Sequence, residues 1–394
     1  MNLAAPVRSK ERNVPTLESL SASQIAAIRS IPSHDESPVR AIDASRPASI
    51  FTDPARFALE QEKVFLALPV PLTMSAVIPN PGDLVATDTY GRNIIVARGK
   101  DGVARAFLNA CSHKGSKLVE DCEPKSASRL VCPYHAWTFG LDGKVLGVPR
   151  AETFANLCKE DRPLAQLGCV EKGGVVWVGL DRKRSYDFGM LDDQLEADFE
   201  ALNLPRMHLH GRKLFDLKAN WKLVLEPFLE GYHVQRLHAQ SVGPLFADVP
   251  STVTLLGRNI RQISGKQQFT PDALDIPGEN IHKSVTHAYQ CFPNLVVVTS
   301  PYYISIMILA PRAVDRTIVD YMMLTRQAPD NPKAEELFAR SYDMILKVFG
   351  GEDFRAAQIS QEGLSSGALE NVLYCGLEEM IPTFYGILEK QMGL

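Results

Sequence analysis

The sequence predicts an α+β protein in which a small all-β domain precedes a larger domain that combines an antiparallel sheet with helices. Three observations support this prediction. Short β-rich runs separated by turn signals begin near Leu84, residues 181–187 form a charged stretch that suits a linker, and helical and extended patterns alternate beyond it. We expect an N-terminal arm and helix at 1–44, the all-β domain at 45–182 and the larger domain at 183–394.

Length and composition agree with this division. A chain of 394 residues can bury two separate cores, and 45% hydrophobic and 22% charged residues are typical of a globular protein. The net charge of -4 gives no reason to expect nucleic acid or an anionic membrane as a partner. No stretch approaches the roughly 20 consecutive apolar residues of a membrane span, and residues 1–30 lack the apolar centre of a signal peptide. We therefore expect a cytoplasmic protein.

The elements before the linker are short. A polar arm contains a helix at about 17–29, and Asp53-Pro54 has the N-cap and first-turn signature of a second helix. Asp101-Gly102 and Asp142-Gly143 are hairpin turn signals between β-rich runs, and residues 175–178 predict a buried strand.

Beyond the linker, apolar periodicity predicts helices and the strands of an antiparallel sheet. We expect helices at 191–202, 220–237, 332–348, 352–364 and from 369 onward, and strands at 212–217, 295–299, 302–309 and 317–324.

Two Cys/His pairs dominate the all-β domain. Cys111-Ser112-His113 and Cys132-Pro133-Tyr134-His135 lie 18 residues apart, and we expect both on loops at hairpin tips. A Rieske [2Fe–2S] cluster takes two Cys on one iron and two His on the other, so each loop would supply one of each. A structural zinc site is the alternative, although zinc modules usually pair Cys with Cys and His with His. The alternating order therefore favours the cluster.

Two further positions indicate the type of cluster protein. Rieske proteins of respiratory complexes carry an extra cysteine in each loop, and the two cysteines form a disulfide. Ser116 and Tyr134 occupy the corresponding positions here, so that disulfide cannot form. This difference indicates the soluble type that serves oxygenases.

The segments 107–115 and 132–137 resemble the cluster loops of Rieske non-haem iron oxygenase α subunits, the family of the aromatic ring-hydroxylating dioxygenases. Lys114 stands where the family usually has Arg, and Ala136 where it usually has Gly, but neither change removes a ligand. The resemblance implies a helix-grip (START-like) catalytic domain with a mononuclear Fe(II). It also implies that the cluster ligands are Cys111, His113, Cys132 and His135.

An oxygenase must offer O₂ an open coordination position, and a Rieske cluster with all its ligands has none. We therefore expect a second metal site. His233 and His238, five residues apart, would form a facial triad with a distant carboxylate. Five residues correspond to about 140° on an α-helix, so we expect the helix to distort or end there. Residues 230–238, which follow Asn220-Trp221-Lys222 in the chain, resemble the iron-binding segment of the same family. That resemblance implies that the third iron ligand is an Asp shortly before a Gln-x-Gly-Leu element, and Asp353 is the residue that fits. Glu352 is the rival candidate for this ligand. The remaining alternative is that both residues only cap a helix.

Glu230 lies three residues before His233 and can reach its imidazole. The resemblance implies a role in electron transfer, because a carboxylate at this position links a cluster histidine of one subunit to an iron histidine of its neighbour. We expect His135 as the cluster partner, and a homotrimer that brings the two centres together. Most members have Asp here, and Glu is found in members that hydroxylate or demethylate amines, although not in them alone.

The resemblance implies a terminal oxygenase that uses O₂ to monohydroxylate, dihydroxylate or dealkylate a small organic substrate. Electrons would come from a separate NAD(P)H-dependent reductase, either directly or through a ferredoxin, since the chain contains no nucleotide-binding or plant-type ferredoxin pattern. A β subunit is also possible. The alternatives from other classes are a Rieske electron-transfer protein without oxygenase activity and a zinc-stabilised binding protein.

The substrate expectation rests on residues 225–310. Aromatic side chains there favour an aromatic or aromatic-acid substrate and a role in aromatic catabolism, whereas Glu230 keeps a quaternary ammonium compound as the alternative. The aromatic side chains are Phe228, Phe246, Phe269, Tyr289 and Phe292. Arg258, Arg261 and Lys266 are candidates to pair with a carboxylate, unless they are only solvated charges.

Overall fold

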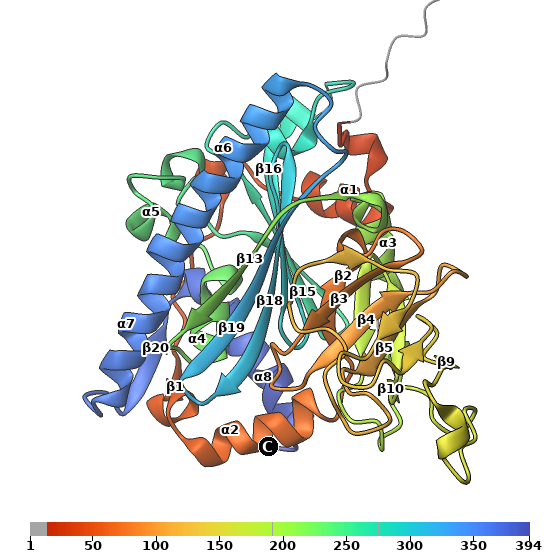
Figure 1. Cartoon of the computed structure of the whole chain (residues 1–394). Coiled ribbons are helices and arrows are strands. Elements are labelled where there is room, and N and C mark those ends of the chain that lie inside the picture. Colours follow the sequence, from red (N-terminus) through yellow and green to blue (C-terminus); the bar gives the residue numbers. More distant parts are fainter. Residues whose placement is uncertain (1–13, 191, 275) are drawn as a thin grey trace, which may run out of the picture.

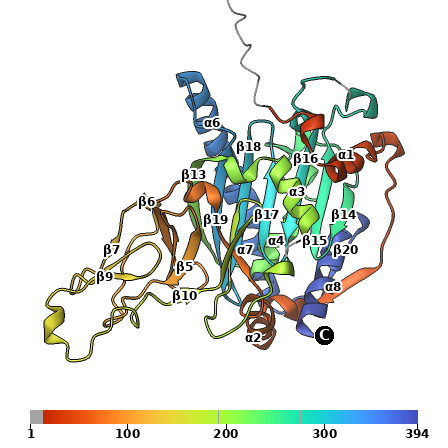
Figure 2. The same cartoon turned by 90° about the vertical axis from the view of Figure 1, so that its right-hand side faces the viewer.

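The computed structural model describes residues 14–190, 192–274 and 276–394. A group of small β-sheets forms one part of the molecule, and a seven-stranded sheet with its helices forms the other (Figure 1; Figure 2). The prediction of a small all-β part followed by a larger α+β part is confirmed. Within the described residues, no helix is long and apolar enough to cross a membrane.

The small part contains three sheets, with strand orders β10-β5-β4-β3-β6, β11-β12-β2 and β7-β8-β9. Their strands are β2 (Val70–Met74), β3 (Asp83–Thr87), β4 (Ile94–Arg98), β5 (Ala104–Leu108), β6 (Lys125–Ser126), β7 (Leu130–Val131), β8 (Thr138–Phe139), β9 (Val145–Gly147), β10 (Gln166–Leu167), β11 (Cys169–Lys172) and β12 (Val175–Val178).

Both predicted hairpin turns are present. Gly102 connects β4 to β5 and Gly143 connects β8 to β9, each with a positive φ that the turn requires. The Cys132 loop lies at the tip of the β7–β8 hairpin, as expected. The Cys111 loop does not lie at a hairpin tip, because it leads from β5 to β6 and β6 pairs with β3.

The larger part is built on an antiparallel sheet with the order β13-β19-β18-β17-β16-β15-β14. Its strands are β13 (His208–Leu217), β14 (Thr252–Leu256), β15 (Asn259–Gly265), β16 (Val285–Cys291), β17 (Leu295–Thr299), β18 (Tyr303–Ala313) and β19 (Arg316–Thr325). Helices α6 (Pro332–Val348) and α7 (Phe354–Ser365) run along one face, and α1 (Ala22–Arg29) and α3 (Asp193–Ala201) lie on the other side (Figure 1; Figure 2).

The helix expected at 220–237 is broken into pieces. Helix α4 (Trp221–Leu225) leads into a 3-10 turn at Glu226–Leu229, Glu230 is extended, and α5 (Val234–Leu237) follows. Pro227 lacks the N–H group that an uninterrupted helix would use, which accounts for the break. The helix expected from 369 onward begins only at α8 (Met380–Met392), because Asn371–Tyr374 form strand β20.

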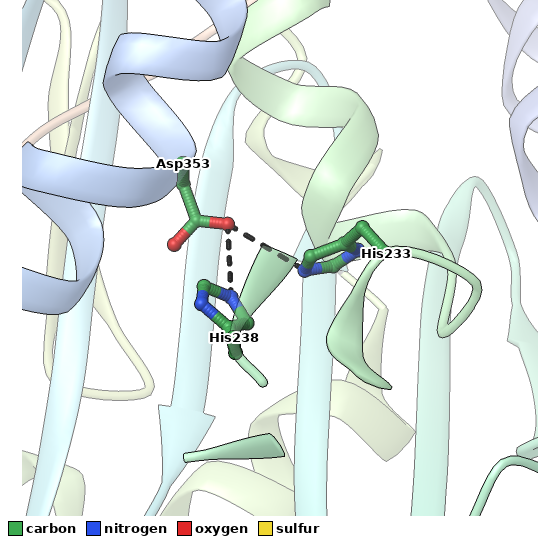
Figure 3. A group of neighbouring side chains, drawn as sticks. All are labelled: His233, His238 and Asp353. Carbon is green, nitrogen blue, oxygen red and sulfur yellow. Dashed lines mark ion pairs between the residues drawn. The ribbon is translucent and has the colours of Figure 1, made fainter. Parts of the chain in front are cut away.

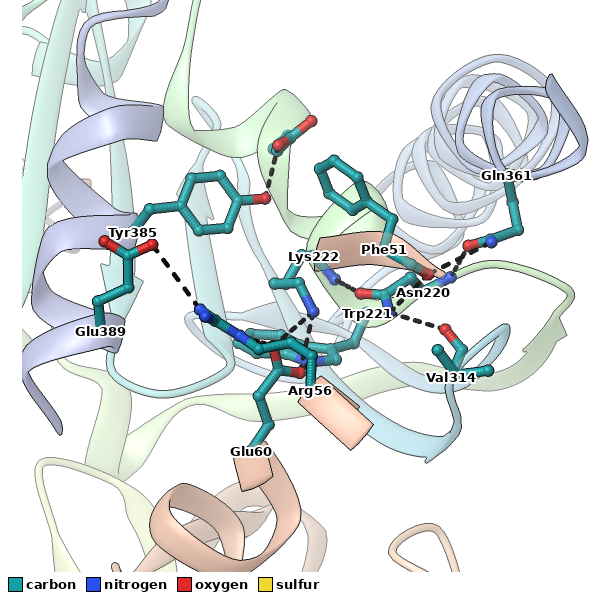
Figure 4. Close-up of polar contacts among 11 residues, drawn as sticks. Phe51, Arg56, Glu60, Asn220, Trp221, Lys222, Val314, Gln361, Tyr385 and Glu389 are labelled. Carbon is teal, nitrogen blue, oxygen red and sulfur yellow. Dashed lines mark hydrogen bonds and ion pairs between the residues drawn. The ribbon is translucent and has the colours of Figure 1, made fainter. Parts of the chain in front are cut away.

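The segment before the small part contacts the larger part. Strand β1 (Ala44–Pro47) pairs with β20, and the buried Glu60 at the end of α2 (Pro54–Glu60) accepts hydrogen bonds from Lys222 Nζ at 2.7 Å and Trp221 Nε1 at 2.8 Å (Figure 4). Asp53 caps α2 as predicted. The predicted boundary at residue 45 thus falls in a segment that is paired with the C-terminal part of the chain.

Candidate metal centres

The four predicted cluster residues lie together in the small part. The thiols of Cys111 and Cys132 are buried, and the rings of His113 and His135 lie 4.7 Å apart between centroids. The buried Nδ1 atoms of both histidines have no hydrogen-bond partner among the described residues. Because an unpaired buried polar atom is costly, these two nitrogens and two thiols fit an inorganic group that takes two sulfur and two imidazole ligands.

The backbone around these residues is tightly turned. The Gly115 amide donates to the Cys111 carbonyl at 2.8 Å, and Gly115 has a φ of 77°. Ala136 has a φ of 55°, a left-handed conformation that glycine adopts without strain. This conformation explains why glycine is the usual residue at that position. Trp137 stacks on the His113 ring at 5.0 Å and fixes its orientation.

The second predicted group is formed by His233, His238 and Asp353 (Figure 3). One ligand atom from each lies within 4.8 Å of the others, and Asp353 Oδ1 is 3.5 Å from His233 Nε2 and 3.2 Å from His238 Nε2. Asp353 is 2% exposed, and neither of its oxygens has a hydrogen-bond partner among the described residues. A buried carboxylate of this kind requires a cation, so the group fits a metal ion held by two imidazoles and one carboxylate.

The local backbone explains how these side chains converge. His233 caps the start of the short helix α5 and His238 caps its end, so the two histidines do not lie within one continuous helix, as their spacing predicted. Asp353 is the last residue of a π-helical turn, Phe349–Asp353, that joins α6 to α7. A π turn contains an extra residue and so changes the direction in which the next side chains point.

Each of these histidines contacts a further carboxylate through its other ring nitrogen. Glu230 Oε1 lies 2.5 Å from His233 Nδ1, and Glu230 Oε2 accepts from the His233 amide at 3.1 Å. Glu352 bonds to His238 Nδ1 and accepts from Ser241 Oγ at 2.7 Å. Burial raises the pKa of Glu352, but the bonds from His238 and Ser241 lower it by more, so the carboxylate stays ionised.

These contacts separate the two rival carboxylates. Asp353 faces the Nε2 atoms of both histidines, whereas Glu352 faces the outer side of His238. The geometry therefore supports Asp353 as the third metal ligand and Glu352 as a residue that orients His238. Nothing in the spacing of Glu352 or Ser241 relates them to His238, so these two contacts could not be predicted from the sequence.

A cavity of about 530 Å³ opens beside the second group, and His233, His238 and Asp353 line it. Its wall is mainly apolar and includes five aromatic side chains, Phe228, Phe246, Tyr302, Tyr303 and Phe349. Helix α6 contributes further apolar residues outside the range 225–310 that was expected to form the wall, among them Leu337, Met344 and Ile345.

Several residues proposed for the cavity lie elsewhere. Phe269, Tyr289 and Phe292 are buried in the core and do not line it. Arg261 is 1% exposed and pairs with Asp198 at 2.6 Å, and Arg258 donates to Gln391 at 2.6 Å on the surface. Of the three cations proposed to bind a carboxylate, only Lys266 lines the cavity.

Comparison with known proteins gives two family matches. Residues 69–166 match the Rieske [2Fe-2S] domain, and residues 204–393 match the ring hydroxylating alpha subunit (catalytic domain). Each match contains one of the two groups described above.

Individual relatives and solved structures agree with these matches. The oxygenase subunit of carnitine monooxygenase from Acinetobacter baumannii is 30% identical over 207 residues, which cover 51% of this chain and 53% of that protein. The aligned stretch thus spans about half the length of this curated relative. Chloroplastic choline monooxygenase from Spinacia oleracea is 26% identical over 91% of this chain and 81% of its own length.

Two solved structures share the fold over most of the chain. A quaternary ammonium Rieske monooxygenase superposes with a TM-score of 0.73, at 21% identity over 91% of this chain and 97% of the other. A naphthalene 1,2-dioxygenase superposes with a TM-score of 0.69, at 21% identity over 89% of this chain and 92% of the other.

Proposed function

We propose that this chain, which belongs to the Rieske non-haem iron oxygenases, is a terminal oxygenase that hydroxylates or dealkylates a quaternary ammonium compound. The observation that carries the proposal is the His233, His238 and Asp353 group on the wall of a cavity, in a chain with a separate two-Cys, two-His group. A Rieske electron carrier would have no use for this second group. A zinc-stabilised binding protein is likewise disfavoured, because the small part matches the Rieske [2Fe-2S] domain.

The choice of substrate rests on the cavity and on the relatives. Aromatic faces bind quaternary ammonium groups through cation–π attraction, and five aromatic side chains line this cavity. The same rings could pack against an aromatic substrate, which was the first expectation from the sequence. The names of the similar proteins, carnitine and choline monooxygenase, favour the quaternary ammonium alternative instead.

The residues around the second group have separable tasks. His233, His238 and Asp353 would hold Fe(II), and all three line the cavity, so a molecule bound there would lie close to the metal. Glu230 and Glu352 lie against the Nδ1 atoms of the two histidines and, with the metal bound, would accept their Nδ1–H groups, which leaves each Nε2 atom to bind the metal. The apolar wall excludes water from the reacting carbon.

The overall reaction balances as a monooxygenation. When bound, the cluster supplies single electrons and the mononuclear iron supplies the site of O₂ activation. A substrate C–H bond becomes C–OH with one oxygen atom of O₂, and the other atom leaves as water with two electrons and two protons. A separate NAD(P)H-dependent reductase would provide the electrons.

The partner arrangement is also a proposal. Val131 and Tyr134, beside the cluster group, are 46% and 64% exposed, and Phe154 packs against His113 while 37% exposed. Exposed apolar residues at a redox group suit contact with a neighbouring subunit in a homotrimer. Glu230, already bonded to His233, would then accept a hydrogen bond from His135 of the next subunit.

The test combines metal analysis with turnover. The purified protein should contain about three irons and two labile sulfides per chain, as one cluster and one mononuclear iron require. With a surrogate reductase, quaternary ammonium compounds such as choline and glycine betaine should stimulate O₂ and NADH consumption in step with hydroxylated or dealkylated product. Coupled consumption with aromatic acids alone would overturn the substrate assignment, and about two irons with no turnover would favour the electron carrier.

A further inference from the structure

Charged side chains are unevenly distributed around the cavity. The two acidic residues on its wall, Glu230 and Asp353, both contact His233. The lysines on its wall are Lys266 and Lys283, which come from other elements. The cavity therefore has a metal-binding acidic region and a separate basic region.

The backbone of Lys266 is held firmly where β15 ends. Its amide donates to the Ser284 carbonyl at 2.9 Å, and its own carbonyl lies 2.9 Å from His34 Nε2. Lys266 also forms an isolated β-bridge with Phe246, one of the aromatic residues of the wall. These contacts from three separate segments fix the origin of the lysine side chain relative to the cavity.

The ammonium of Lys266 differs from the other cations near the cavity. Lys283 pairs with Glu279 at 3.6 Å, and its side chain is 54% exposed. Lys266 is half-buried, and no carboxylate lies within ion-pair distance of it among the described residues. Burial alone lowers its pKa, with no acidic neighbour to oppose the shift.

The ammonium of a half-buried lysine side chain loses part of its hydration, and an anion that binds to it offsets this loss. The acidic residues of the wall cannot fill this role because they contact the histidines of the metal group. Among the described residues that line the cavity, no other carboxylate is left, so a molecule bound in the cavity is the candidate source of negative charge.

We propose that Lys266 is the anion-binding subsite of this cavity and that the substrate carries a carboxylate, which Lys266 binds. The inference rests on the proposed function in one respect, namely that the cavity holds the substrate. It narrows the substrate class to ammonium acids of the betaine type, which carry a carboxylate, over ammonium alcohols of the choline type, which do not. The apolar and aromatic wall then surrounds the uncharged or quaternary part of the molecule.

Binding to the intact holoenzyme without O₂ tests the proposal independently of turnover. Dissociation constants are measured by calorimetry for two matched pairs, glycine betaine with its methyl ester and benzoate with methyl benzoate. In each pair that binds, the acid should bind about 10- to 100-fold more tightly than its ester, the range for a hydrogen bond to a charged group. Equal affinities for acid and ester in the unaltered protein would overturn the anion-binding subsite.

Three variants sharpen the test. Lys266→Met should reduce the acid-over-ester ratio to about 1, and Lys266→Arg should keep most of it because the charge remains. Arg258 was also a candidate to pair with a carboxylate, but it lies outside the cavity. The Arg258→Met variant should therefore bind each acid and ester as the unaltered protein does. Far-UV circular dichroism and a thermal unfolding midpoint close to that of the unaltered protein confirm that each variant is folded. An unchanged acid preference in Lys266→Met would refute the role of Lys266.

The outcomes also separate this inference from the proposed function. If benzoate binds in a Lys266-dependent manner and glycine betaine does not bind, the carboxylate subsite stands and the quaternary ammonium assignment fails. If choline and glycine betaine are turned over equally and Lys266→Met changes neither, the proposed function stands and the subsite fails.

Discussion

The replacement of Glu352 by alanine tests how the second metal group is organised. The Glu352 carboxylate bonds to one proposed metal ligand, His238, whose side chain is 5% exposed and whose Nδ1 faces it. Removing the carboxylate leaves a nearly buried Nδ1–H without its acceptor, and such a loss costs about 1–3 kcal/mol. Because the Glu352 side chain is itself 29% exposed, water can replace part of the lost bond, and we expect the low end of this range.

The corresponding change in metal affinity is about 10-fold, which is also the low end of the effects known for carboxylates that orient ligating histidines. Fe(II) or Co(II) titrated into metal-depleted protein, with the bound metal quantified by elemental analysis, measures it. The cluster absorbance should not change, since the cluster group lies in the other part of the chain.

Two matched variants test the physical reason. Glu352→Gln keeps an acceptor oxygen without the charge and should lose less affinity than Glu352→Ala. Ser241→Ala removes only the hydrogen bond to Glu352 and should have the smallest effect. If Glu352→Ala binds the metal as tightly as the unaltered protein, the carboxylate does not orient His238 and the reasoning is refuted.

Three further predictions concern other parts of the same structure. Asp353→Ala should abolish turnover and reduce the iron content by about one per chain while the cluster spectrum stays intact, and loss of the spectrum would contradict the two-centre assignment. Glu230→Gln should keep both metals, because the amide oxygen can still accept from His233, but should slow electron delivery in rapid-mixing experiments; unchanged coupled turnover would remove the bridging role. Lys222→Met should lower the free energy of unfolding by about 3 kcal/mol in urea titrations, the low end for breaking a buried pair, because the buried Glu60 would keep only its 3.3 Å ion pair with Arg56 and the bond from Trp221. The further change Glu60→Gln should restore most of the loss. A Lys222→Met variant as stable as the original would show that the pair is neutral to stability.

Local signals in the sequence predicted a large share of the fold. The Asp-Gly turns, the strand at 175–178 and helix α6 at its observed bounds all depend on residues close together in the chain. The four cluster residues could be named because two short motifs contain them. These features share one property: neighbours in sequence determine them.

The failures involve tertiary context. The break after α4 could have been anticipated from Pro227, but the apolar pattern on either side resembled one continuous helix. Strand β20 could not have been predicted, because four residues form a strand there only through pairing with β1 at the other end of the chain. The same reason explains why α6 was not expected to line the cavity and why Glu352 was left as a rival of Asp353.

The contact between Glu60 and Lys222 limits how far the two parts of the chain are independent modules. Both side chains are fully buried, so a fragment that starts at the predicted linker would enclose an ammonium group with no counter-ion and would lack the partner strand of β20. Such a fragment should not fold on its own, although it would contain the complete second metal group. Strand β1 and Glu60 are thus needed to complete the larger part of the molecule, and its assembly must wait until they and the distant strand β20 have all been synthesised.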